Sequence, residues 1–364
     1  MQELWKSDWK IEVTLDINNL VRPEVMALKP YKPAQSLPNM IRLNANENPY
    51  TLFDENEDMA LNLYPQAVPV KIRNAVADYL NLSVEKCVIT RGSTEAIDLL
   101  TRVFCRPKID EVIIFPPTFE MYRVYASIQG AKIKSVPLLE NENYALDVSE
   151  LKRQITPESK LTFLTSPSNP TGHSFSKRTI FEVCESLKGV GLLILDAAYI
   201  EFTGKDYTSE LLNEFDNVVV LRTLSKAFGL AGSRCGAMLS SKAICDLVMR
   251  VIPPYSFSVP AEQSVLKALS DKGITNSKNN IKKIIEERKY LFTEFSKIDC
   301  IKKVFSSDAN FILLRVEDAD RFYQRAMDVK LLVRNVSYQP TLENCIRVTV
   351  GSREQNNLLI KAIR

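Results

Sequence analysis

Histidine is almost absent from this sequence, because its 364 residues include only His173. A Ser-His-Asp triad, a metal site with several histidines or a histidine proton relay would each depend on that one residue, so the sequence argues against all three. For His173 itself we expect a surface or loop position and no catalytic role. Chemistry near neutral pH then needs another proton carrier, and a lysine amine held as an imine is one of the few available.

Paired cysteines are also lacking. The seven cysteines are odd in number, widely scattered and never arranged as C-x-x-C, so neither a zinc site nor a disulfide framework is expected. We interpret them as buried thiols and predict no metal. They are Cys87, Cys105, Cys184, Cys235, Cys245, Cys300 and Cys345.

Long apolar runs and an excess of one charge are missing too. No stretch approaches the roughly 18 apolar residues that span a bilayer, and residues 1–16 mix charges with Trp5 and Trp9, without an apolar signal core. We therefore expect a cytoplasmic protein that does not enter a membrane. The 47 basic and 44 acidic residues are interspersed, which argues against a nucleic-acid partner.

Short apolar runs that are rich in β-branched residues alternate with helix-like stretches in the middle of the chain. Such runs are apolar on both faces, as in buried and mostly parallel strands covered by helices, so we predict an α/β sheet sandwiched by helices. The expected strands are 87–90, 111–115, 160–165, 192–196 and 217–221.

After about Tyr255 the pattern changes to a long charged helix over 277–295 and short strands near 310–315 and 345–350. This pattern predicts a smaller α+β domain. We place a plausible hinge at Pro253-Pro254, because consecutive prolines cannot continue a helix. The predicted division is a large ligand-binding domain over 45–254, and a small domain made of 1–44, with its N-terminal arm, and 255–364.

In parallel sheets ligands bind beyond the carboxyl ends of the strands, so the polar residues there are the candidates for chemistry. The first expected strand ends in Thr90-Arg-Gly-Ser-Thr94, where a glycine turn leads into a helix through Ser93 and Thr94. Free backbone N–H groups at such a helix start suit a phosphate, although a capped helix that binds nothing has the same pattern.

Asn169, Asp196 and Tyr199 follow the next strands and are expected on the same rim. A turn alone would explain the prolines and glycine around Asn169. Asp196 directly closes an apolar run, and a buried carboxylate there needs a cationic or hydrogen-bonding partner.

The fifth expected strand leads to Thr223, Ser225 and Lys226, with Arg234 eight residues after the lysine. Two hydroxyls and two cations form a second possible anion site, although a solvated basic loop would have the same composition. Lys226 stands between apolar residues, where desolvation would lower the pKa of its amine and favour the nucleophilic neutral form.

Together these residues occur in the order and at the intervals of the fold-type I aminotransferases, and the sequence resembles the histidinol-phosphate aminotransferase family most closely. The resemblance runs from about residue 18 to the C-terminus. The matching motifs are LNANENP at 43–49, LYP at 63–65, FC at 104–105, PTFEMY at 117–122, AYIEF at 198–202, LRTLSKAF at 221–228, AGSRCG at 231–236 and IRVTVGSRE at 346–354.

The resemblance implies a fold-type I enzyme with pyridoxal 5′-phosphate as its cofactor. Lys226 would hold the cofactor as an imine and then move the substrate proton. Asp196 would pair with the pyridine nitrogen, Asn169 and Tyr199 would hydrogen-bond the phenolate oxygen, and Phe119 would stack on the ring. The residues expected around the cofactor phosphate are Ser93, Thr94, Thr223, Ser225, Arg234 and, from the other subunit, Tyr64.

That crossing tyrosine implies a homodimer. The resemblance also places Arg334 and Arg347 at the anionic group of the substrate and Tyr31 in an N-terminal segment that closes over the site. The implied reaction is reversible amino transfer between L-histidinol phosphate and 2-oxoglutarate in histidine biosynthesis. A threonine-phosphate decarboxylase or an aromatic amino acid aminotransferase would reuse the same cofactor residues. A cofactor-binding regulator would need a DNA-binding extension, which the first 40 or so residues do not resemble.

Two positions depart from the family pattern. Ala197 stands where a glutamate is usual, and Ser93-Thr94 replaces a small residue followed by aspartate. Neither change removes a group with an expected catalytic role, so we expect little loss of activity from them.

Overall fold

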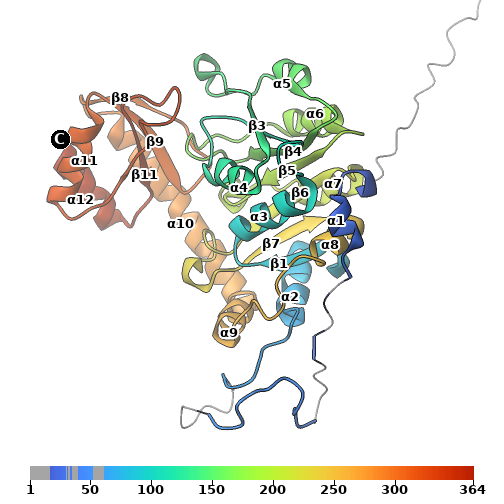
Figure 1. Cartoon of the computed structure of the whole chain (residues 1–364). Coiled ribbons are helices and arrows are strands. Elements are labelled where there is room, and N and C mark those ends of the chain that lie inside the picture. The colour runs from blue at the N-terminus through green and yellow to red at the C-terminus, as the bar shows by residue number, and fades with distance from the viewer. Residues whose placement is uncertain (1–16, 30, 32, 35–39, 52–60) are drawn as a thin grey trace, which may run out of the picture.

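The structure, a computed structural model, describes residues 17–29, 31, 33–34, 40–51 and 61–364. A seven-stranded sheet with helices on both faces forms its larger part, and a four-stranded antiparallel sheet with its own helices forms the smaller part (Figure 1). The predicted class, an α/β fold with a smaller α+β unit, is therefore confirmed. Residues 1–16, on which the expectation about a signal segment depends, lie outside the described residues.

The large sheet has the strand order β1-β7-β6-β5-β4-β2-β3. The pairs from β3 through β6 are parallel, while β7 runs antiparallel to both β1 and β6. All five expected strands are present, and β3 and β7 were not predicted. The bounds are β1 (Cys87–Thr90), β2 (Glu111–Ile114), β3 (Lys132–Ser135), β4 (Ser159–Thr165), β5 (Leu192–Asp196), β6 (Val218–Thr223) and β7 (Gly236–Ser240).

The central strands are apolar on both faces because each face is covered by helices. Along β5, Leu193 and Leu195 belong to one core cluster, and Leu192 and Ile194 belong to the other. One layer of helices contains α1 (Pro23–Ala27), α3 (Ser93–Phe104), α4 (Met121–Gln129) and α8 (Lys242–Val248). The other contains α2 (Val70–Leu80), α5 (Val148–Gln154), α6 (Lys177–Leu187), α7 (Thr208–Glu214) and α9 (Val259–Ala268).

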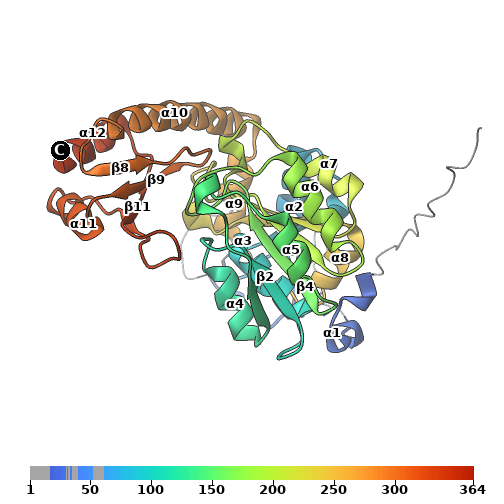
Figure 2. The same cartoon turned by 90° about the horizontal axis from the view of Figure 1, so that it is seen from above.

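The helix α10 (Asp271–Phe295) runs from the large sheet to the small one (Figure 2). It begins six residues before the expected helix, at the N-cap Ser270, whose hydroxyl accepts a hydrogen bond from Gly273 N at 3.2 Å. The small sheet has the order β10-β11-β9-β8. Its elements are β8 (Ile301–Val304), β9 (Phe311–Val316), α11 (Ala319–Asp328), β10 (Arg334–Asn335), β11 (Cys345–Thr349) and α12 (Arg353–Ile363).

Five short 3-10 turns complete the described elements, namely η1 (Ile17–Asn19), η2 (Val84–Lys86), η3 (Glu140–Glu142), η4 (Ile200–Phe202) and η5 (Ala231–Ser233). Ile17 and Val25, from the first turn and helix, pack into the core beside α3. The domain boundaries at 44/45 and 254/255 stay a prediction, as does the hinge at Pro253-Pro254, which lies between α8 and α9. Among the described residues, no helix combines the length and apolarity needed to cross a membrane.

Replacing Ile194 by alanine tests the importance of the double-sided core. Its side chain has no exposed area and lies in the middle strand of the sheet, so we expect a loss of about 3 kcal/mol in the free energy of unfolding. Urea denaturation at one protein concentration measures this loss. The control is Ile128→Ala on exposed α4 surface, expected within about 0.5 kcal/mol of the parent. Equal effects of the two substitutions would contradict the assignment of the core.

Candidate active site

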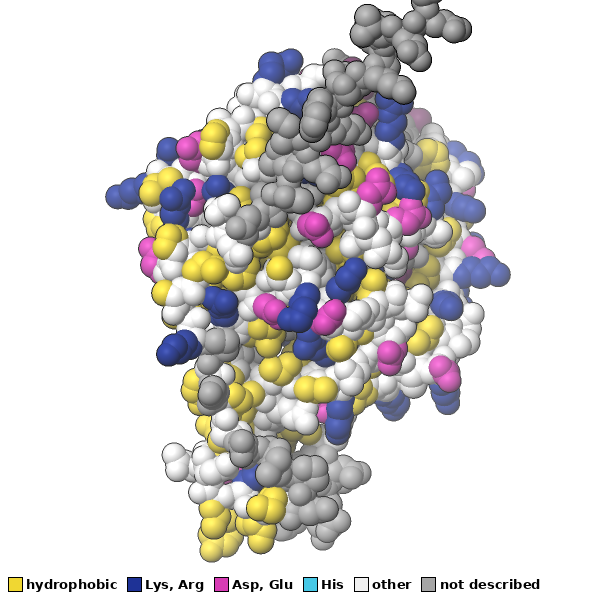
Figure 3. Space-filling view, turned by 90° about the vertical axis from the view of Figure 1, so that its right-hand side faces the viewer, with side chains coloured by type: hydrophobic (Ala, Val, Ile, Leu, Met, Phe, Trp, Pro, Cys, Tyr) yellow, Lys and Arg dark blue, Asp and Glu magenta, His cyan; other side chains and the backbone are white. Residues whose placement is uncertain are grey.

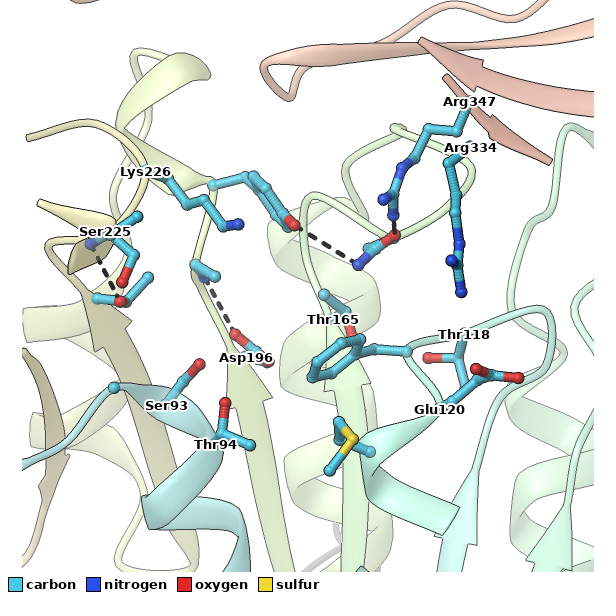
Figure 4. A pocket seen from close by; sticks show the side chains of 18 of the residues that line it. Ser93, Thr94, Thr118, Glu120, Thr165, Asp196, Ser225, Lys226, Arg334 and Arg347 are labelled. Carbon is cyan, nitrogen blue, oxygen red and sulfur yellow. Dashed lines mark hydrogen bonds between the residues drawn. The ribbon is translucent and has the colours of Figure 1, made fainter. Parts of the chain in front are cut away.

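A cavity of about 440 Å³ opens at the carboxyl ends of β4, β5 and β6, beside the start of α3 (Figure 4). Apart from Tyr31 and Tyr64, all the expected site residues line it. They are Ser93, Thr94, Phe119, Asn169, Asp196, Tyr199, Thr223, Ser225, Lys226, Arg234, Arg334 and Arg347.

Asp196 is the buried acid at the floor of this cavity. Its Oδ2 accepts a hydrogen bond from the hydroxyl of Tyr122 at 2.7 Å, and its Oδ1 accepts one from Ala198 N at 3.1 Å. Burial raises the pKa of the carboxyl group, while these two hydrogen bonds and the charge of Lys226 oppose that rise. Water does not reach this buried carboxylate, so the two donors stabilise its charged form in place of water.

Tyr122 supports this site through Asp196, and sequence reasoning gave it no role. It is fully buried in α4, its ring stacks on Phe163 at 4.7 Å, and its hydroxyl also lies 2.6 Å from Thr165 Oγ1. A tyrosine within an otherwise apolar buried face was the available signal, because a buried phenol needs a polar partner. Burial raises the pKa of Tyr122 well above its usual value, so the phenol stays protonated and remains a donor.

Lys226 reaches into the same cavity from the loop after β6. Its Nζ lies 5.7 Å from the centre of the Tyr199 ring, and within the described part of the chain its amine has no hydrogen-bond partner. Partial burial lowers the pKa of Lys226, as do Arg347 and Arg234, and only Asp196 opposes them. The surroundings thus favour the neutral amine, as expected of a nucleophile or base.

Asn169 and Tyr199 form a hydrogen-bonded pair in the cavity wall. Asn169 Nδ2 donates to the Tyr199 hydroxyl at 3.5 Å, and Arg347 Nη1 donates to Asn169 Oδ1. Burial raises the pKa of Tyr199 to about 12, so this phenol is protonated at neutral pH. Since Arg347 belongs to β11, this contact joins the small sheet to the rim of the large one.

Two segments form an anion site at the end of the cavity near α3. Gly92 turns with φ 83° into the helix start at Ser93 and Thr94, and a Cβ on Gly92 would meet Arg234 Nη2 at 2.9 Å. Arg234 is held by Ala231 O at 3.0 Å and by Ser225 Oγ at 3.4 Å. Helix N–H groups, hydroxyls and a guanidinium thus converge where a phosphate would bind.

The residues present fit a flat aromatic cofactor with a phosphate at one end. The anion site would take the phosphate, the carboxylate of Asp196 would match a protonated ring nitrogen, and Phe119 offers an aromatic ring at the cavity wall. Among the described residues there is no group of three or more histidine, cysteine or acidic side chains that could hold a metal ion.

The family model for aminotransferase class I and II matches residues 38–363. The chain belongs to this family. A histidinol-phosphate aminotransferase from Buchnera aphidicola subsp. Diuraphis noxia is 36% identical over 354 residues, covering 96% of this chain and 97% of the relative. At that level of similarity this aminotransferase also belongs with the histidinol-phosphate aminotransferases, and the cofactor of its class is pyridoxal 5′-phosphate.

Solved structures agree on the fold of this aminotransferase. The histidinol-phosphate aminotransferase from Clostridium acetobutylicum superposes with a TM-score of 0.75 at 24% identity, covering 83% of this chain and 90% of that one. The enzyme from Sinorhizobium meliloti, solved in complex with pyridoxal-5′-phosphate, gives 0.73 at 22% identity, with 83% and 82% covered.

Several expected residues lie outside the cavity of this aminotransferase. Tyr31 and Tyr64 are exposed, and the Tyr64 ring lies 5.0 Å from that of Tyr255. His173 is half-buried in the loop after Asn169 and contacts Thr171 Oγ1 at 2.9 Å. Ala197, at the position of the usual glutamate, points into an apolar core cluster.

The cysteines were expected to be free, buried thiols. All seven cysteines are unpaired, and six of them are buried; Cys300 is partly exposed.

Tyr122→Phe tests the hydrogen bond to Asp196 in this aminotransferase. Loss of one donor raises the pKa of the Asp196 carboxyl group further, so the acidic limb of the pH–activity profile should move to higher pH. We expect kcat/KM at neutral pH to fall about tenfold, the usual effect of losing a hydrogen bond to a charged group. Tyr125→Phe on the same helix is the control, and a Tyr122→Phe profile that overlays that of the control would contradict this role.

Proposed function

We propose that this enzyme transfers an amino group reversibly between L-histidinol phosphate and 2-oxoglutarate, giving imidazole acetol phosphate and glutamate, in histidine biosynthesis. One observation carries the choice of substrate. Arg334 on β10 pairs directly with Arg347 on β11, and directly opposed residues of an antiparallel pair project from the same face of the sheet. Both guanidinium groups line the cavity.

This arginine pair suits a phosphate or a carboxylate. The Arg334 side chain is exposed, and within the described part of the chain its one hydrogen bond goes to the Tyr338 hydroxyl, at 3.5 Å, with the Tyr338 ring 5.9 Å away. Arg347 is more buried and keeps Asn169 as a partner. Guanidinium groups bind planar or tetrahedral oxyanions with two N–H donors each, so the pair can hold the phosphate of one substrate and a carboxylate of the other.

The bound cofactor withdraws electrons from the substrate Cα, which makes that carbon acidic enough to lose a proton. In our proposal Asp196 keeps the ring nitrogen protonated, and Asn169 and Tyr199 donate to the oxygen on the ring. Lys226 Nζ would take the proton from the substrate Cα and deliver it to the cofactor carbon C4′, a role that suits its lowered pKa. Phe119 covers the ring, while the residues at the start of α3 hold the cofactor phosphate with Thr223, Ser225 and Arg234.

A threonine-phosphate decarboxylase and an aromatic amino acid aminotransferase remain the alternatives with the same cofactor residues, because a fold does not determine the reaction. The decarboxylase would release carbon dioxide from O-phosphothreonine without a keto acid. The aromatic enzyme would prefer phenylalanine to histidinol phosphate.

An absorbance scan tests the main proposal. Purified holoenzyme mixed with L-histidinol phosphate, without a keto acid, should convert its cofactor band to the band of the amine form. Adding 2-oxoglutarate should restore the original spectrum, and Lys226→Ala should abolish the conversion because the proton carrier is gone. Phenylalanine and O-phosphothreonine are the comparison donors; a faster conversion with either one would replace the proposed substrate.

We also propose that the enzyme is a homodimer in which Tyr64 reaches the cofactor phosphate of the other subunit. Large apolar side chains of the segment before α2 are exposed, a composition that typically marks a protein interface. Hydrophobic side chains gather on the lobe at the bottom of Figure 3. Within the described residues from 40 to 69, the most exposed large apolar side chains are those of Met40, Ile41, Leu43, Tyr50 and Tyr64.

A mixing experiment tests this shared site. Tyr64→Ala and Lys226→Ala homodimers should each have low activity, and co-expression of the two chains should restore up to about a quarter of the parent activity, because each mixed dimer contains one intact site. Co-expression of Lys226→Ala with Asp196→Ala is the control and should restore no activity, because each subunit of that mixed dimer lacks a group of its own site. Restoration that is absent in the first pair would exclude a crossing Tyr64.

We propose a cytoplasmic location as well. The seven unpaired cysteines support it, because thiols stay reduced in the cytosol.

A further inference from the structure

Two carboxylates line the cavity, and the cofactor accounts for only one of them. Asp196 lies at the floor, where it would meet the ring nitrogen of the cofactor. Glu120, between Phe119 and Met121, is on the side of the cavity away from Lys226, where Arg334 also lies (Figure 4). We propose that Glu120 is a specificity-determining residue that accepts a hydrogen bond from the imidazole N–H of the substrate. This inference rests on the proposed function.

Glu120 has no visible structural task. It occupies the N-cap position of α4 with helical backbone angles, yet its side chain makes no capping hydrogen bond. Within the described residues its carboxylate has no hydrogen bond or salt bridge, and Arg123, one helical turn along, donates instead to Ser135 Oγ at 3.2 Å. A general attraction to the helix N-terminus is the remaining structural explanation, and any acid in a first turn would provide it.

The two amino donors differ in the group at the end of one arm, and a carboxylate at this position can distinguish the two groups. From the amine-bearing carbon, histidinol phosphate extends one arm with a phosphate and one with an imidazole, whereas both arms of glutamate end in carboxylates. With Arg334 and Arg347 holding the anionic arm, the remaining arm is an N–H donor in the first substrate and an anion in the second. Glu120 attracts the first and repels the second.

The two cations therefore cannot explain the preference for an imidazole by themselves. A site with arginines alone would bind any phosphate or dicarboxylate of suitable length. The other residues of this part of the chain that line the cavity, Val336, Tyr338 and Gln339, bear no charge, so Glu120 is the charged acceptor on that side. A hydrogen-bonding group in a pocket discriminates strongly against analogues that lack the matching group. An enzyme that selects an imidazole among several phosphate-bearing amines needs this kind of discrimination.

The test compares three amino donors in single-turnover reactions of the holoenzyme. They are L-histidinol phosphate, L-phenylalaninol phosphate, which keeps the phosphate but lacks the ring N–H, and L-glutamate. Glu120→Ala should lower kcat/KM for histidinol phosphate about tenfold, as expected for a lost hydrogen bond to a charged acceptor. The value for phenylalaninol phosphate should stay within twofold of the parent or rise, and the value for glutamate should not fall.

Two further variants make the result specific. Glu120→Gln keeps an acceptor oxygen without the charge. Its kcat/KM for histidinol phosphate should therefore lie between the values of the parent and of Glu120→Ala. Glu354→Ala removes an exposed acid from the first turn of α12 and should change none of the three values.

An equal loss on both phosphate donors, or no loss on histidinol phosphate, would overturn the role of Glu120. A parent enzyme that does not react with histidinol phosphate would instead overturn the proposed function.

Discussion

The arrangement of this site depends on one buried carboxylate. Burying an ionised Asp196 costs several kcal/mol unless donors replace the lost water, and Tyr122 and Ala198 N provide those donors. Because Tyr122 belongs to α4 while Asp196 ends β5, this hydrogen bond also fixes the helix that carries Phe119 and Glu120 just before its first turn. The acid that supports the cofactor and the residues that would meet the substrate are thus positioned by the same contact.

A second contact joins the two sheets. Arg347 projects from β11 and donates to Asn169, which follows β4 of the large sheet, while its guanidinium group lies 5.3 Å from the ring of Phe311. Partial burial lowers the pKa of Arg347, yet arginine remains charged at any working pH. This cation also lowers the pKa of Lys226, so an anionic substrate that neutralises it would raise the basicity of the amine when the proton has to be taken.

The sequence predicted those parts of the molecule that depend on local pattern. Runs such as 192–196 are apolar on both faces, which identifies buried strands, and parallel strands bring the residues after them to one rim; Asp196 and Lys226 were found in this way. The bond between Tyr122 and Asp196 joins residues 74 positions apart, and no local pattern encodes such a pairing. Strand β7 was missed because GAMLS has no β-branched residue, and β3 because three of the four residues of its KIKS sequence are polar, at the edge of the sheet. Tyr31 and Tyr64 lie outside the cavity of their own chain. The role expected of Tyr64 depends on another subunit, and the role expected of Tyr31 depends on its segment closing over the site.

The cavity has cations at both ends, so the orientation of the bound cofactor needs an explanation. Arg234 is accompanied by the N–H groups of α3 and by fixed hydroxyls, which can surround a phosphate dianion, whereas Arg334 and Arg347 come from the small sheet and offer guanidinium groups alone. A resident phosphate gains most from the first environment because its donors are already oriented. A substrate that must enter and leave in every cycle is better served by the second, where the exposed Arg334 can exchange its partner for water. The asymmetry of the donors therefore supports the proposal that the cofactor phosphate binds at the Arg234 end and that the two substrates bind at the other.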